Sequence, residues 1–232
     1  TYGMMLLAVG MLSTTACKKP KGCTDPNAEN YDPDATEDDG TCISLPYKVE
    51  TVTISGQSYE KVTGTINENY TFTSNKKWLL SGGIFVSSNA TLTIQAGTEI
   101  FAADDATTPF LSIARGSKIK AIGTASSPIV MTTIKTVTGT PSAGDWGGII
   151  INGKAQINNG TEAEGEGGTG KYGGSVDNDN SGTIKYVRVE YAGKLLGTDN
   201  ELNGFSFNGV GSGTTVEYIQ AYRGADDGIE FF

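Results

Sequence analysis

The residues with the clearest potential for chemistry are acidic and amide side chains enclosed between Cys23 and Cys42. Carboxylate and amide oxygens are the ligands that a hard cation such as calcium takes. The segment has almost no apolar residue apart from Tyr31, so it cannot fold around a core of its own. We expect a Cys23–Cys42 disulfide, which would contribute about 3 kcal/mol for a loop of this size, together with bound calcium. The predicted calcium ligands are Asp25, Asn27, Asn30, Asp32, Asp34, Asp38 and Asp39, and the alternative is a solvated acidic turn.

A second calcium-like pattern begins at Asp177 but lacks an essential ligand. Residues 177–182 have the Asp-x-Asp-x-Ser-Gly spacing that opens a calcium loop, yet Arg188 occupies the twelfth position, where a bidentate glutamate is required. We therefore expect a turn built from Asx side chains.

Candidate catalytic residues are few. The chain contains no histidine, which excludes Ser-His-Asp and Cys-His catalysis and histidine-ligated zinc. Asp226 and Glu230 would share one strand face about 13 Å apart, beyond the ~5–9.5 Å that glycoside hydrolysis uses. The adjacent Asp226 and Asp227 would point to opposite faces of that strand. The sequence predicts no catalytic pair, and a β-helix polysaccharide lyase or glycoside hydrolase is kept as the alternative to a binding protein.

Aromatic residues favour binding. Exposed tyrosines can stack on sugar rings, although tyrosines paired across stacked strands are also ordinary structural ladders. The candidate ligand-binding residues are Tyr172, Tyr186, Tyr191, Tyr222, Asp226 and Asp227.

The composition of the chain limits which partners and which fold classes are expected. The 232 residues include 17 Lys and Arg against 26 Asp and Glu, a net charge of −9. Nucleic acids require a basic patch, so no nucleic-acid partner is expected. With 32 glycines and 37% hydrophobic residues, the composition fits an ordered all-β protein rich in bends.

A short internal copy indicates which elements carry these residues. Leu92–Ile100 returns as Leu111–Ile119, an offset of 111 − 92 = 19 residues. Each copy alternates apolar and polar residues on both sides of a glycine, the pattern of half-buried strands joined by a bend. We expect the copies to stack on one another in a β-solenoid, and a β-sandwich is the alternative.

A second copy lies near the C-terminus. Residues 181–193 are echoed by residues 212–224, an offset of 212 − 181 = 31, which would place Glu190 beside Ala221 and Tyr191 beside Tyr222. Between the copies, the glycine- and acid-rich segment 158–182 is long enough that we expect it to be functional.

The N-terminus resembles an export signal. Met4–Leu12 is an apolar run too short to span a bilayer, and small residues follow it up to Cys17. This pattern resembles a bacterial lipobox, in which the cysteine is lipidated, although Thr14 replaces the usual leucine and no Lys or Arg precedes the run. A buried strand with a free cysteine is the alternative. Since the chain begins at Thr1, we expect its true start to be missing.

Two stretches resemble proteins of Bacteroidetes. Residues 22–42 resemble the Gly-Cys-Thr-Asp-Pro…Asp-Asp-Gly-Ser-Cys module of their exported proteins, with Thr41 in place of the serine. Residues 64–232 resemble their right-handed parallel β-helix lipoproteins, through Leu-Ser-Ile-Ala-Arg-Gly at 111–116, Gly-Asp-Trp-Gly-Gly at 144–148, Tyr-Val-Arg-Val-Glu-Tyr at 186–191 and Asp-Asp-Gly-Ile-Glu at 226–230. The resemblance implies an outer-membrane lipoprotein and no settled activity.

The predicted organisation has five parts. They are a signal peptide at 1–16, a tether at 17–21, the acidic module at 22–42, a linker with a first strand at 43–63, and a β-helix at 64–232 that we expect to be cut at its C-terminal end. We expect an exported, lipid-anchored envelope protein whose β-helix is a non-catalytic binding or adhesive scaffold. Its expected partners are the outer membrane and either a polysaccharide or another cell-surface component.

Overall fold

The computed structural model describes residues 19–24, 32–42, 46–198 and 200–232. The chain divides into two compact units, Thr1–Leu45 and Pro46–Phe232. Within the described ranges, no helix has both the length and the apolar character needed to cross a membrane.

The first unit is a small module closed by the Cys23–Cys42 disulfide. Its regular structure is one parallel pair of short strands, β1 (Lys21–Gly22) and β2 (Glu37–Asp38). Cys23 is buried, whereas the described acidic side chains of the module are exposed, apart from the partly buried Asp32. The disulfide expected from the cysteine spacing is thus confirmed.

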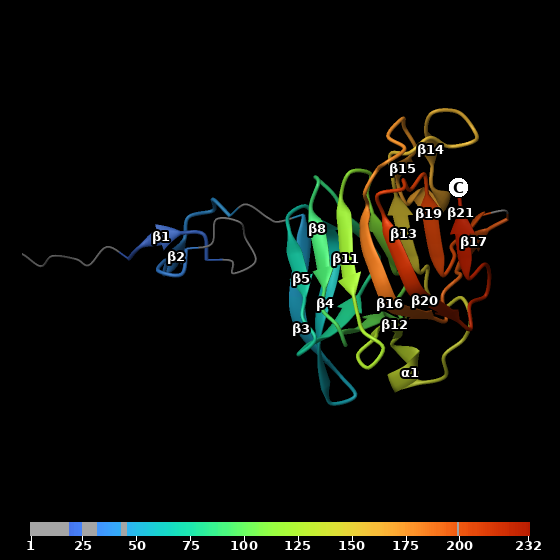
Figure 1. Cartoon of the computed structure of the whole chain (residues 1–232). Helices are drawn as coiled ribbons and strands as arrows, with labels where there is room; N and C mark the ends of the chain where they lie inside the picture. The colour runs from blue at the N-terminus through green and yellow to red at the C-terminus, as the bar shows by residue number, and fades with distance from the viewer. Residues whose placement is uncertain (1–18, 25–31, 43–45, 199) are drawn as a thin grey trace, which may run out of the picture. The chain divides into compact units, whose positions relative to one another are not determined.

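The second unit is a parallel β-helix. The chain winds so that strands from successive turns lie side by side, as β5, β8, β11, β16 and β20 do in Figure 1. Along β8 (Thr91–Ile94), Leu92 and Ile94 are buried while the two threonines are partly exposed, because successive side chains of a strand point to opposite faces. Three sheets run along the helix, and nearly all their pairings are parallel, which excludes the β-sandwich alternative.

The bounds of the strands follow sheet by sheet. Sheet 1 consists of β5 (Tyr70–Phe72), β8, β11 (Lys118–Ile122), β16 (Gly182–Glu190) and β20 (Thr215–Tyr222). Sheet 2 consists of β4 (Gln57–Ile66), β6 (Lys77–Leu80), β9 (Glu99–Ala102), β12 (Ile129–Thr133) and the second halves of β16 and β20. Sheet 3 consists of the end of β4, β7 (Gly83–Val86), β10 (Phe110–Ile113), β13 (Ile149–Asn152), β19 (Phe205–Asn208) and β21 (Ile229–Phe231).

The remaining elements cover parts of the outer surface. The hairpin of β3 (Tyr47–Ile54) and β4 occupies the segment where a linker and a first strand were expected. Its Tyr59 packs on Leu79 of β6 and Phe101 of β9, whose side chains lie on the outer face of sheet 2. The other elements are α1 (Lys135–Thr138), β14 (Ala163–Glu164), the 3₁₀ turn η1 (Glu166–Gly168), β15 (Lys171–Tyr172), β17 (Leu195–Gly197) and β18 (Asn200–Glu201).

The first internal copy does not stack on itself, which corrects the expectation from the sequence. Leu92 pairs with Ile119 in sheet 1, an offset of 119 − 92 = 27, whereas Leu111 pairs with Ile84 and Ile149 in sheet 3. The copied pattern is a strand, a glycine corner and a second strand, and a β-helix has several such corners in each turn. The local pattern therefore recurs more often than the chain completes a turn.

The second copy does stack, but one residue out of the expected register. Thr183 pairs with Thr215, an offset of 215 − 183 = 32, so Val189 and not Glu190 lies beside Ala221. This register places buried Ile184 and Val187 of β16 beside Val216 and Ile219 of β20. A slip of one residue would turn these inward side chains to the outer face.

Candidate functional site

Two stacked tyrosines mark the corner between sheets 1 and 2. The rings of Tyr186 and Tyr218 are 4.4 Å apart with planes 8° from parallel, and Tyr218 is 65% exposed. Both residues adopt the left-handed backbone conformation, with φ of 51° and 53°. This conformation is unusual for a bulky side chain, and strain of this kind gathers at functional positions. In the previous turn of the β-helix, Ile122 pairs with Lys185. Gly123, the next residue, therefore occupies the corner position that Tyr186 takes one turn later.

Polar side chains continue this surface along the outer side of sheet 2. Arg188 pairs with Gln220 and Glu190 with Tyr222 in the β16–β20 register, and these four residues line a shallow pocket. Arg188 Nε lies 2.8 Å from Glu190 Oε1. We call this surface the tyrosine face and define it as Tyr186, Arg188, Glu190, Tyr218, Gln220 and Tyr222.

Lys185 adds a cation to the tyrosine face. Its Nζ lies 6.0 Å from the Tyr186 ring centroid, 5.6 Å from that of Tyr218 and 2.8 Å from Glu217 Oε2. The salt bridge to Glu217 raises the pKa of Lys185, so the amine stays charged. An ammonium above aromatic faces orders the rings without covering Tyr218.

Carboxyl groups gather on the outer side of sheet 3, beneath the insertions 158–175 and 194–203. Asn203 Nδ2 donates a hydrogen bond to Glu230 Oε2, and Asn203 itself is buried. Burial raises the pKa of Glu166 to about 7, and neighbouring carboxylates contribute to the rise. The pKa of Glu230 is also raised, first by burial and then by the charges of Asp227 and Asp226. We call this group the acidic cluster: Glu166, Glu201, Asp226, Asp227 and Glu230.

The acidic cluster corrects the expected placement of its aspartates. β21 begins only at Ile229, so Asp226 and Asp227 lie in the corner before the strand and not on its two faces. The spacing of about 13 Å expected between Asp226 and Glu230 assumed that both lie in one extended strand, so it does not apply. Glu166 belongs to the acid-rich segment 158–182 that was expected to be functional, whereas sequence reasoning did not consider Glu201, which lies in a separate insertion. A carboxyl group whose pKa is raised within a group of carboxyls is an arrangement that acid–base chemistry can use.

Comparison with known proteins shows which family shares this architecture. Residues 64–232 match the family described as pectate-lyase-like beta helix domains. The chain belongs to this family. A curated protein, the chloroplastic ribulose bisphosphate carboxylase/oxygenase activase of Arabidopsis thaliana, is 71% identical over 24 residues, which are 10% of this chain and 5% of that protein. No solved structure matches the chain.

The pectate-lyase-like domain buries two of the tyrosines selected from the sequence. Tyr172 is 7% exposed and its ring lies 6.0 Å from that of Phe232. Tyr191 is 9% exposed and meets Tyr222 edge-on. Only Tyr186 and Tyr222 of the four predicted tyrosines belong to the tyrosine face. Tyr218, the most exposed tyrosine of that face, was missed, because it lies opposite Tyr186 only in the 32-residue register.

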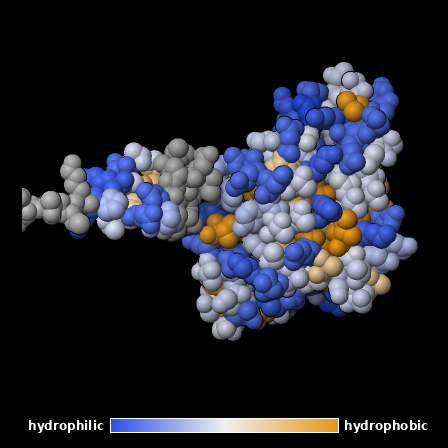
Figure 2. All heavy atoms as spheres, turned by 60° about the vertical axis from the view of Figure 1, so that its left-hand side comes forward, coloured by the Kyte–Doolittle hydropathy of each residue, from blue (hydrophilic) through white to orange (hydrophobic). Residues whose placement is uncertain are grey.

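The polar face of the pectate-lyase-like domain in Figure 2 is broken by small apolar patches. On the outside of the last two turns, the exposed aromatic residues include Tyr218 and Tyr222.

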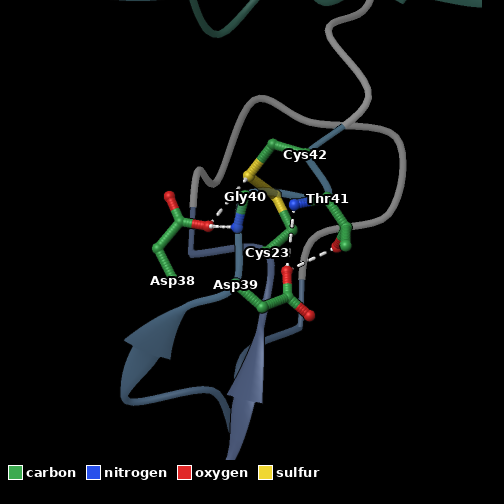
Figure 3. Close-up of a disulfide and its surroundings, with 6 residues drawn as sticks. All are labelled: Cys23, Asp38, Asp39, Gly40, Thr41 and Cys42. Carbon is green, nitrogen blue, oxygen red and sulfur yellow. Dashed lines mark hydrogen bonds between the residues drawn. A yellow bond between two sulfur atoms is a disulfide. The ribbon is translucent and has the colours of Figure 1, made fainter.

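In the first unit, Asp38 and Asp39 accept hydrogen bonds within the turn that leads to Cys42 (Figure 3). Asp38 Oδ1 accepts a hydrogen bond from the Gly40 amide, and Asp39 Oδ1 accepts from the Thr41 amide and hydroxyl. Asp32 Oδ1 accepts likewise from the Asp34 amide. Among the described residues, no three His, Cys, Asp or Glu side chains are grouped so that they could hold a metal ion. The predicted ligands Asp25, Asn27 and Asn30, and the predicted lipidation site Cys17, lie outside the described residues.

The calcium-like pattern at residues 177–182 forms the expected Asx turn. Asn180 Oδ1 accepts a hydrogen bond from the Gly182 amide, and Asp179 Oδ2 accepts from the Ser181 hydroxyl. These bonds turn the chain into β16 and so set the start of the strand that carries Tyr186.

Proposed function

We propose that this protein is a cell-envelope protein whose β-helix binds carbohydrate through the tyrosine face without cleaving it. The observation that carries the proposal is the Tyr186–Tyr218 stack, exposed at a corner where the backbone is strained. Sugar rings offer apolar faces to aromatic rings and hydroxyl groups to planar polar side chains. The tyrosine face supplies both kinds of partner, since Arg188, Glu190 and Gln220 lie beside the rings.

Glycan binding by variants of the tyrosine face tests this proposal. Wild type is titrated with a panel of neutral and uronate oligosaccharides by calorimetry. Tyr218→Ala is expected to weaken binding at least tenfold, because it removes one stacking ring, whereas Tyr218→Phe retains most of the affinity. Val137→Ala, an exposed change in α1 and outside the face, is the control. If Tyr218→Ala binds as tightly as wild type, the tyrosine face is not the site.

The second candidate function is a polysaccharide lyase or glycoside hydrolase. The acidic cluster favours it, because burial and the charges of neighbouring carboxyl groups raise the pKa of Glu166 to about 7. Incubation with uronate and neutral polysaccharides decides between the two functions. Release of reducing ends or unsaturated sugars that is lost in Glu166→Gln would overturn the binding scaffold in favour of an enzyme.

We also propose an outer-membrane address for the protein. The apolar run before Cys17 and the resemblance of residues 22–42 to modules of exported Bacteroidetes proteins support a lipid anchor. In cells, Cys17→Ser is expected to move the protein from the membrane fraction to the soluble fraction. A wild-type protein that is already soluble after export would contradict the anchor.

A further inference from the structure

We propose that the acidic cluster binds a small aliphatic diamine, independently of the carbohydrate proposed for the tyrosine face. Two features support the proposal: an excess of negative charge that the described chain does not neutralise, and a buried acceptor that lacks a hydrogen-bond donor. An ammonium group supplies both a positive charge and three N–H donors.

The surroundings of the acidic cluster carry a net negative charge. The segments 158–175, 194–203 and 223–230 contain eight Asp and Glu against three Lys and Arg. A further cation, Arg115, is paired with Glu162. Within the described residues, no Lys or Arg forms a salt bridge with a member of the acidic cluster. Burial and mutual repulsion raise the pKa of two of its carboxyl groups, and a bound cation would relieve the repulsion.

Hydrogen bonds between the segments hold these carboxyl groups together. The Gly167 amide of the η1 turn donates to Asn200 Oδ1 at 2.9 Å, which joins η1 to the β17–β18 insertion. The Gly204 amide donates to the Asp227 carbonyl at 2.9 Å, so the corner before β21 lies against the end of the same insertion. Leu196 of β17 lies against Gly167 and is exposed, so its side chain offers apolar surface to the methylene groups of a ligand.

A buried amide side chain points into the acidic cluster. Asn203 is 1% exposed, and its Nδ2 donates hydrogen bonds to Glu230 Oε2 and, at 3.5 Å, to Ser206 Oγ. Its Oδ1 has no hydrogen-bond partner among the described residues. Because a buried acceptor without a donor is costly, Asn203 favours a ligand that brings an N–H group beside Glu230.

The spread of the carboxyl groups favours an extended cation over a metal ion. Within the described ranges, no three His, Cys, Asp or Glu side chains are grouped closely enough to hold a metal. Glu166 and Glu230 are partly buried, whereas Asp226 and Asp227 are exposed in the corner before β21. One ammonium would lie at the partly buried pair and the other at the exposed pair, with the methylene groups between them.

Calorimetric titration of the intact protein with 1,4-diaminobutane, butylamine and 1,4-butanediol at pH 7.5 tests the site. The diamine is expected to bind with one-to-one stoichiometry and about tenfold more tightly than butylamine, because its second ammonium makes further charge-assisted contacts. The diol, which has the same carbon chain and no charge, should not bind. An equal concentration of calcium chloride should leave the affinity for the diamine unchanged.

Variants separate the two ends of the ligand. Glu230→Gln should weaken both amines about tenfold, since it removes the charge beside Asn203. The double variant Asp226→Asn, Asp227→Asn should reduce the affinity for the diamine to that for butylamine. Glu99→Gln, the same change of charge on an exposed side chain of β9, should bind as wild type does.

Circular dichroism and thermal unfolding check that each variant is folded. Four results would each overturn the proposal: no binding of the diamine by wild type, equal affinity for the diamine and butylamine, displacement of the diamine by an equal concentration of calcium, or an unchanged affinity in Glu230→Gln.

Discussion

At the scale of single residues, the carboxyl group of Glu166 is strongly perturbed by its surroundings. Burial and the charges of Glu230, Glu201 and Asp226 raise its pKa to about 7. A carboxyl whose pKa is higher in the folded protein favours folding while it is protonated. That stabilisation is complete below the unfolded pKa of 4.5 and is lost as the pH rises to about 7.

We therefore expect Glu166→Gln to be more stable than wild type at pH 8 and equally stable at pH 4. The gain should be about 1–2 kcal/mol, since solvent screens part of the repulsion. Urea unfolding at both pH values measures it. Glu162→Gln is the control on the same insertion, because Arg115 lowers the pKa of Glu162 and its loss should give no gain. A Glu166→Gln variant with an unchanged pH dependence would contradict this account of the cluster.

At the scale of elements, a buried polar column attaches the insertion 158–175 to sheet 3. The carbonyl of Thr169 accepts hydrogen bonds from Ser112 Oγ at 2.6 Å and Asn152 Nδ2 at 3.0 Å. Asn208 Nδ2 donates in turn to Asn152 Oδ1 at 3.0 Å. Asn152 is fully buried, so its bonds are shielded from water and costly to break.

Asn152→Leu is expected to destabilise the protein by about 1–3 kcal/mol, because it leaves the Asn208 amide without its acceptor. Urea unfolding gives the magnitude, and limited proteolysis should show faster cleavage within 158–175. Asn200→Ala is the control: it removes only the exposed bond to the Gly167 amide and should cost less than 1 kcal/mol. Equal losses in the two variants would show that the column does not hold the insertion.

At the scale of the whole molecule, the chain is divided into two units that are stabilised differently. The module of the first unit is closed by the Cys23–Cys42 disulfide, whereas the second unit has a core of aliphatic and aromatic side chains along the β-helix. A unit without a core depends on its cross-link, and a unit with a core does not.

Reduction of the disulfide should therefore disorder the module and leave the β-helix intact. The loop spans 19 residues, so the cross-link is worth about 3 kcal/mol. In NMR spectra of the full chain, reductant should collapse the amide signals of residues 32–42 toward random-coil positions. The thermal transition of the β-helix, followed by circular dichroism, should not shift, and a joint loss of both would contradict their independence.

Calcium binding to the module remains a prediction with its own test. Asp32, Asp38 and Asp39 use their Oδ1 atoms for turns, and a cation would take the Oδ2 atoms. Calcium titration of the oxidised full chain should shift the signals of these residues and saturate in the millimolar range of extracellular modules. Magnesium is the control and should produce smaller shifts. Unchanged spectra at 50 mM calcium would leave the module a plain acidic turn.

The amino-acid sequence alone determined the fold class and the disulfide. Alternation of apolar and polar residues around glycine corners depends on neighbours along the chain, so it indicates half-buried strands and bends before any contact is known. The parallel β-helix was expected from the resemblance of residues 64–232 to β-helix lipoproteins. The cysteine loop with almost no apolar residues likewise required a cross-link. The same local information suggested 19- and 31-residue repeats, which the structure replaces with strand pairings offset by 27 and 32 residues.

Only the tertiary structure decided the register and the sites that depend on it. The corners between strands differ in length, so sequence similarity does not give the register. The register is set by which inward side chains pack together, and this places Tyr218 over Tyr186. Glu166 and Glu230 are distant in sequence, and they approach only because an insertion returns over sheet 3. Each site depends on long-range packing, which a sequence pattern of short period does not encode.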